Sequence, residues 1–156
     1  MGIKRYTASA DTTIVNAFQP NLVTRGTGAN MGLADVMEVF SIYGRATTSS
    51  AELSRILVKF PIDAVNTDRT NNVIPNSGNV SWYLRLSNAK HSRTVPPEAK
   101  YVIYPVSQSW QEGIGLDLEG YKDLTKGNSG ANWMSASSTA KWGVVGGTYL
   151  TASGQG

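Results

Sequence analysis

The sequence contains no cysteine, and this absence removes several kinds of chemistry at once. Without thiols the chain has no disulfide, no thiolate zinc site and no cysteine nucleophile. It has a single histidine, His91, so a metal site built from several histidines is excluded as well. A serine triad would need His91 together with a serine in a glycine-flanked elbow, a pattern that the sequence lacks. We interpret His91 as an exposed loop residue and predict that the protein is not an enzyme.

Charged residues and long apolar runs are also scarce. Only 16% of the residues are charged, and the net charge of +3 is spread along the chain without a basic stripe. Because binding to a phosphate backbone depends on such a stripe, no nucleic-acid partner is expected. No apolar run approaches the roughly 20 residues of a membrane-spanning helix, and residues 1–6 lack the apolar core of a signal peptide. We expect no membrane partner and synthesis in a cytoplasm.

Small and polar loop residues are abundant. Of 156 residues 16 are glycine, serine, threonine and asparagine are frequent, and apolar residues make up 40%. This composition is typical of a loop-rich all-β protein, and the length suits one domain with a single core. We therefore expect one domain over residues 1–150, followed by a polar tail at residues 151–156.

Alternation of apolar and polar side chains is clearest in residues 53–60, which read LSRILVKF. A period of two predicts a β-strand, and we place this one in the centre of a sheet, with Arg55 on its wetter face anchoring loops through carboxylate or carbonyl contacts. Residues 80–86, VSWYLRL, alternate in the same way and are predicted to be its antiparallel partner, with Trp82 in the core. Residues 100–106 predict a third strand, at an edge or a bulge because a proline interrupts it.

Residues 3–8 and 12–18 predict two short strands, or one strand broken at residues 9–11. A further strand is predicted at residues 142–150, and a helical turn within residues 63–72. Residues 36–43 fit either a helix face or a strand, and their Val, Phe, Ile and Tyr residues favour the strand. Many short strands joined by long loops predict an all-β protein, a jelly-roll-like antiparallel β-sandwich.

An acidic loop lies at residues 110–123 and carries Glu112, Asp117, Glu119 and Asp123. The leading interpretation is a solvated loop. Oxygen-rich loops also bind calcium, so Glu112 and Asp117 are candidate ligands of a structural Ca²⁺, although the spacing matches no EF-hand. Catalysis by a glycosidase pair of carboxyl groups is a third interpretation, ranked below both.

Aromatic residues in the loops offer a second kind of candidate site. Sugars stack on exposed aromatic rings, and Trp110, Tyr121 and Trp133 are the candidate platform for a glycan. The alternative is that Trp110 and Trp133, which lie near glycines, plug the end of a sandwich.

Four short motifs follow one another along the chain: ADT at residues 10–12, SRILVKF at 54–60, WYLRL at 82–86 and VSQSWQEG at 106–113. In order and spacing they resemble the DNRLRE-type jelly-roll domain over roughly residues 8–142. That domain is a β-sandwich similar to carbohydrate-binding modules and is found in secreted multidomain proteins. The resemblance implies a jelly roll.

A narrower resemblance involves residues 1–18, 24–32, 38–43 and 129–133, which look like virion structural proteins of tailed phages, especially marine and cyanobacterial T4-like ones. It implies a non-enzymatic docking or decorating module located in the virion. Its expected partners are other virion proteins and further copies of itself in a symmetric assembly, and it leaves capsid, neck, tail and fibre open. The alternative function is a carbohydrate-binding module that recognises surface glycans.

The chain departs from the jelly-roll pattern after its second tryptophan motif. The domain usually continues with further strands that close the sandwich, whereas this sequence ends in a Gly- and Ser-containing tail. Two explanations stay open. The sequence is a segment of a longer protein, or a neighbouring subunit completes the sheet by pairing with its open edge.

Overall fold

A computed structural model describes residues 2–76, 78–90, 97–116, 118–122 and 130–151. The chain divides into two compact units. Met1–Ser9 and Lys59–Lys100 form one, called here the helical unit, and Ala10–Val58 with Tyr101–Gly156 form the other, called the sheet unit. His91 and most of the predicted polar tail lie outside the described residues.

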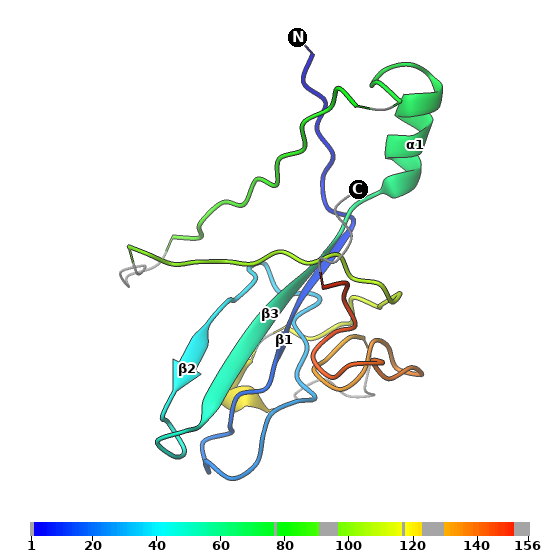
Figure 1. The fold of residues 1–156 in the computed structure, drawn as a ribbon. Helices are drawn as coiled ribbons and strands as arrows, with labels where there is room; N and C mark the ends of the chain where they lie inside the picture. Colours follow the sequence, from blue (N-terminus) through cyan, green and yellow to red (C-terminus); the bar gives the residue numbers. More distant parts are fainter. Residues whose placement is uncertain (1, 77, 91–96, 117, 123–129, 152–156) are drawn as a thin grey trace. The chain divides into compact units, whose positions relative to one another are not determined.

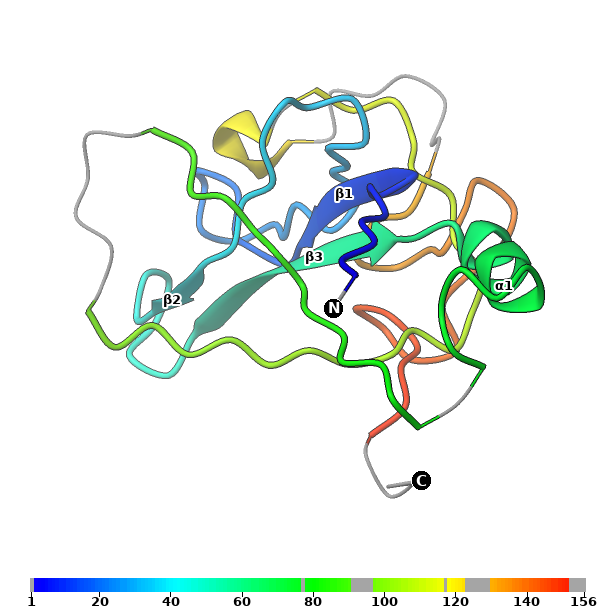
Figure 2. The same ribbon diagram turned by 90° about the horizontal axis from the view of Figure 1, so that it is seen from above.

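The sheet unit is built on three antiparallel strands, β1 (Ala10–Val15), β2 (Ser41–Tyr43) and β3 (Ala51–Lys59). The strand order is β1-β3-β2, and Figures 1 and 2 show β3 lying between the other two. The register of the β2–β3 pair places Ser41 opposite Leu53 and Tyr43 opposite Ala51. The predicted central strand is confirmed, because β3 has a neighbour on each side.

The predicted partner of that strand is wrong. Both edges of β3 are taken by β1 and β2, and residues 81–86 are exposed and extended without being part of a strand. Trp82 has 55% of its surface exposed, so it is not a core residue. Alternation identifies a stretch that can form a strand, but it does not say which strand will pair with it. The observed pairing is accompanied by contacts between side chain and backbone, such as the Asn16 side-chain oxygen that accepts the Leu53 N–H at 2.6 Å.

The core of the sheet unit consists of two clusters, one on each face of β1. Ile14 packs with Leu57, Trp133 and Trp142 in the first cluster. Val15 on the opposite face packs with residues that include Met31 and Leu118 in the second. Because successive strand residues point to opposite faces, this alternation buries β1 on both sides.

Several predicted strands are present only in part. Residues 12–18 contribute β1, which ends at Val15, and residues 36–43 contribute β2, which begins at Ser41. In the described part of the chain, the predicted strands at residues 100–106 and 142–150 form no ladder: they meet at an isolated bridge, Val106 to Tyr149, beside which the rings of Tyr104 and Tyr149 stack with their centres 4.8 Å apart. The described chain is therefore a small β-rich fold with long irregular connections.

The helical unit contains α1 (Ile62–Thr70), the region where a helical turn is predicted. Pro61 precedes the helix, a position at which the missing proline N–H is harmless, and Val65 is its buried residue. The amino-terminal arm is tied to it: Tyr6 donates a hydrogen bond of 2.6 Å to Asp68, and the Lys4 ammonium lies 2.9 Å from the same carboxylate. Among the described residues no helix is long and apolar enough to cross a membrane.

Candidate functional site

The three aromatic residues predicted to stack on a glycan do not form one patch. Trp133 is buried in the first core cluster, and Trp110 is half-buried against that cluster. Tyr121 is half-buried and packs on the second cluster, with its ring 5.7 Å from that of Phe40. The structure therefore brings Trp110 and Trp133 together and leaves Tyr121 apart from them.

Arg55 covers one face of the Trp133 ring. Its guanidinium lies 4.9 Å from the centre of that ring, and one of its nitrogens donates to the Gly146 carbonyl at 2.6 Å. This contact holds the loop that contains Gly146 against the sheet. The predicted role of Arg55, anchoring a loop through a carbonyl contact, is confirmed. Its predicted place on the wetter face of the strand is wrong, because Arg55 shares a face of β3 with the buried Leu57 and packs on the buried Trp133.

Glu112 is committed to the backbone of β1. Its carboxylate accepts the Asp11 N–H at 2.8 Å, and burial together with the Glu112 charge raises the pKa of Asp11. Asp117 and Asp123 lie outside the described residues, and within the described ranges no group of three or more His, Asp or Glu side chains is placed to hold a metal ion. For Glu112 the geometry supports a structural role at the start of the sheet.

Asn30 is a buried polar hub that the sequence did not reveal. Its amide nitrogen donates to the carbonyls of Glu112 and Ala131, at 2.7 and 2.6 Å. Its oxygen accepts the N–H groups of Gly32 and Gly115, both at 3.0 Å. One side chain therefore satisfies backbone groups from three loops, and an asparagine in a glycine-rich stretch is the only sequence signal for it.

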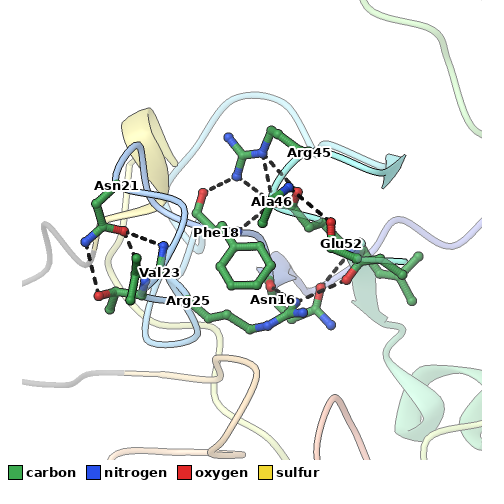
Figure 3. Close-up of polar contacts among 12 residues, drawn as sticks. Asn16, Phe18, Asn21, Val23, Arg25, Arg45, Ala46 and Glu52 are labelled. Atoms are coloured by element: carbon green, nitrogen blue, oxygen red, sulfur yellow. Dashed lines mark hydrogen bonds and ion pairs between the residues drawn. The ribbon is translucent and has the colours of Figure 1, made fainter. Parts of the chain in front are cut away.

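A second buried network centres on Glu52, the side chain of which is fully enclosed (Figure 3). The carboxylate accepts hydrogen bonds from the Arg45 guanidinium and from the Phe18 N–H, the latter at 2.6 Å. These bonds, first of all that from Arg45, lower the pKa of the Glu52 carboxyl. The network joins the loop after β1 to the β2–β3 hairpin.

Arg25 lies beside Phe18 in the same region of the sheet unit. It donates to the carbonyls of Asn16 and Ala51, at 2.6 and 3.1 Å, and its guanidinium lies 4.1 Å from the centre of the Phe18 ring. The close-up shows Phe18 with an arginine on either side (Figure 3). These charged groups form hydrogen bonds within the protein itself, so we assign them a structural role.

The outer edge of β2 is a different kind of feature, because its outward backbone groups have no protein partner among the described residues. The Ser54 N–H donates to the Phe40 carbonyl at 3.1 Å, and the Gly44 N–H donates to the Ser50 carbonyl at 2.9 Å. Alternate residues of an antiparallel strand bond to the same neighbour, so the N–H and C=O groups of Ser41 and Tyr43 face away from β3. In the described part of the chain no group bonds to them.

The other edge of the sheet is covered. Ile14 of β1 forms a bridge with Asn30, and the Thr12 hydroxyl accepts the Met31 N–H at 3.2 Å. Together with the Glu112 contact at Asp11, these bonds leave β2 as the open edge of the sheet. An open edge is a template for another strand.

Comparisons of the chain with protein-family models, with curated proteins and with solved structures found no match.

Proposed function

We propose that the protein is a structural component of a tailed-phage virion, a non-enzymatic docking or decorating module that works in a symmetric assembly. The resemblance of its motifs to virion proteins suggests the setting. The proposed architecture is a jelly-roll-like sandwich, of which the three-stranded sheet is one part. The observation that carries the proposal is a large amount of exposed apolar surface on extended chain.

Two stretches provide this surface. Residues 81–90 are all exposed and include Trp82 and Tyr83, the latter with 89% of its surface in solvent. Residues 101–104 read YVIY and are exposed along their whole length. Within the described residues neither stretch forms a backbone hydrogen bond. Proteins that act alone rarely expose so many neighbouring large apolar side chains, so this pattern favours burial against a partner.

The polar groups of the sheet unit support a structural role rather than a reaction. The buried carboxylate of Glu52 and the half-buried one of Glu112 hold backbone N–H groups, and Asn30 holds three loops together. These polar groups fix the conformation of the loops. A rigid surface with an open strand edge is what a repeated assembly needs.

The test is the protein composition of purified particles. We expect the protein in particles purified by density gradient, at a fixed copy number per particle and resistant to washing with salt. Its absence from washed particles, while it remains abundant in the lysate, would overturn the virion proposal.

A carbohydrate-binding module is the second candidate, and one observation favours it. The half-buried Tyr121 lines a hollow together with Glu38, Glu119 and Gly120, and an aromatic ring beside carboxylates is a common sugar-binding arrangement. A glycan array should then show binding that Tyr121→Ala abolishes and Tyr43→Ala, at an exposed tyrosine outside the hollow, does not change. An array without any binding would remove this candidate.

A further inference from the structure

We propose that residues 80–86 of one copy add as a β-strand to the outer edge of β2 in a second copy. The inference rests on the proposed assembly function and names the partner and the surface. Three observations among the described residues support it. The outer edge of β2 (the acceptor edge) is open, residues 80–86 (the donor stretch) have no strand partner, and the two carry opposite charge.

The acceptor is the edge formed by Ser41 and Tyr43, the outward backbone groups of which lack partners in the described part of the chain. Tyr43 has 74% of its surface exposed, and Val36 and Val39 just before the strand are also exposed. A strand that joined this edge would satisfy the backbone groups and cover these side chains. This is the geometry of β-strand addition.

The donor is residues 80–86, VSWYLRL, which have the period-two alternation of a strand but no strand partner. They have no helix or turn assigned, and Figure 1 draws this stretch as an extended trace, so pairing would not require a helix or a turn to be unfolded first. Seven extended residues span about 23 Å, enough to cover the whole of β2 and the residues that flank it.

Charge determines which surfaces can pair. Residues 35–43 carry Asp35 and Glu38 and no basic residue, whereas residues 80–90 carry Arg85 and Lys90 and no acidic residue. All four side chains are exposed. Two β2 edges would repel each other, and so would two donor stretches, so the favourable contact joins a donor to an edge.

The same asymmetry holds for the whole units. By sequence the helical unit has eight basic and three acidic residues, and the sheet unit has six basic and eight acidic residues. A donor-to-edge contact uses two different surfaces, so a pair of copies joined by one contact still has one free edge, on the first copy, and one free donor stretch, on the second. Such a contact repeats into a ring or a filament rather than stopping at a dimer.

Single-cysteine variants test this contact directly, because the chain has no cysteine of its own. Tyr43→Cys and Tyr83→Cys proteins would be mixed at high concentration and oxidised mildly, and Ser81→Cys would replace Tyr83→Cys to allow for another register. We expect a disulfide-linked dimer of the two variants. Its formation should be about tenfold faster than with Thr139→Cys in place of Tyr43→Cys, since a disulfide needs Cβ atoms about 4 Å apart.

Charge reversal provides a second and independent test. Glu38→Lys and Arg85→Glu should each slow the cross-linking, and the two together on opposite partners should restore it. Equal rates at Tyr43 and Thr139, or no rescue by the paired reversal, would overturn the inference. It would also be overturned if a Tyr43→Cys, Tyr83→Cys double variant closed within a monomer while the mixed single variants did not link.

These results are separable from the test of the proposed function. Protein present in washed particles but without cross-linking at β2 would leave the virion proposal standing and remove only this contact. Cross-linking at β2 by a protein absent from particles would do the reverse.

Discussion

Arg45 and Glu52 form an ion pair in which the carboxylate is fully buried while 31% of the guanidinium side chain is exposed. The pair is unequal, because solvent can reach one partner and not the other. Loss of the arginine would therefore leave an isolated charge in the protein interior, which is far more costly than loss of the carboxylate.

Arg45→Ala should lower the free energy of unfolding by about 3–5 kcal/mol, since it leaves the buried Glu52 carboxylate without its cation. Glu52→Gln should cost only about 1–2 kcal/mol, because the amide still accepts a hydrogen bond and Arg45 is partly solvated. Urea unfolding followed by circular dichroism measures both. The double variant should be more stable than Arg45→Ala alone, and additive losses would contradict this account.

The same pair predicts how stability depends on acid. The pKa of Glu52 is lowered in the folded state, mainly by its hydrogen bonds from Arg45. Its contribution is therefore fully present above the unfolded pKa of about 4.3 and is lost as the pH falls through the folded pKa. The urea midpoint should fall more steeply between about pH 5 and about pH 3 in the native protein than in Glu52→Gln.

An acid-sensitive contact in the helical unit affects the native protein and Glu52→Gln equally. The hydrogen bond from Tyr6 also lowers the pKa of Asp68, which adds an acid dependence of the same sign. Because Asp68 is present in both proteins, the difference between them reports Glu52. Parallel curves for the two proteins would contradict the assignment.

Tyr6 should lose its proton at an unusually high pH. Its hydrogen bond to Asp68 raises its pKa to about 12, so this bond stabilises the arm below pH 10 and is lost as the pH rises through the folded value. The difference in tyrosinate absorbance between the native protein and Tyr6→Phe isolates one residue among seven tyrosines. In Asp68→Asn this difference titration should move back towards about 10, and an unchanged curve would contradict the contact.

Asn30→Ala should be severely destabilising. It leaves the carbonyls of Glu112 and Ala131 and the Gly115 N–H without their partner, at about 1–3 kcal/mol for each buried group. Asn21→Ala is the matched control, because Asn21 also accepts two backbone N–H groups but lies in an exposed turn, where water replaces it. Equal losses in thermal melting temperature for the two variants would show that Asn30 is not a hub.

The parts of this fold that could be predicted from the sequence are those set by local pattern. Residues 53–60 alternate strongly and form most of β3, and the helical stretch after Pro61 is present as α1. The pairing of strands could not be predicted, because it depends on contacts between residues far apart, such as Glu52 with Phe18. Trp82 illustrates the difference, since its alternation fits a core strand while its surroundings leave it exposed.

The candidate sites were harder to predict for a related reason. Glu112 lies in an acidic stretch that suggests a solvated loop or a cation site, yet its carboxylate caps the first strand. Trp133 lies in a loop between Asn132 and Met134, yet it is buried under Arg55. In both cases the role is set by a partner about 80 to 100 residues away in the chain, which composition and spacing do not encode.

The shortness of β2 has a consequence for how an assembly would grow. Ser41 and Tyr43 offer four free backbone groups, and at about 0.5–1.5 kcal/mol for each hydrogen bond a single contact would be weak. Two copies that meet in dilute solution would soon separate, which protects newly made chains from premature aggregation. Copies held side by side on a scaffold would make many such contacts together, so the ring or filament would be stable where the pair is not.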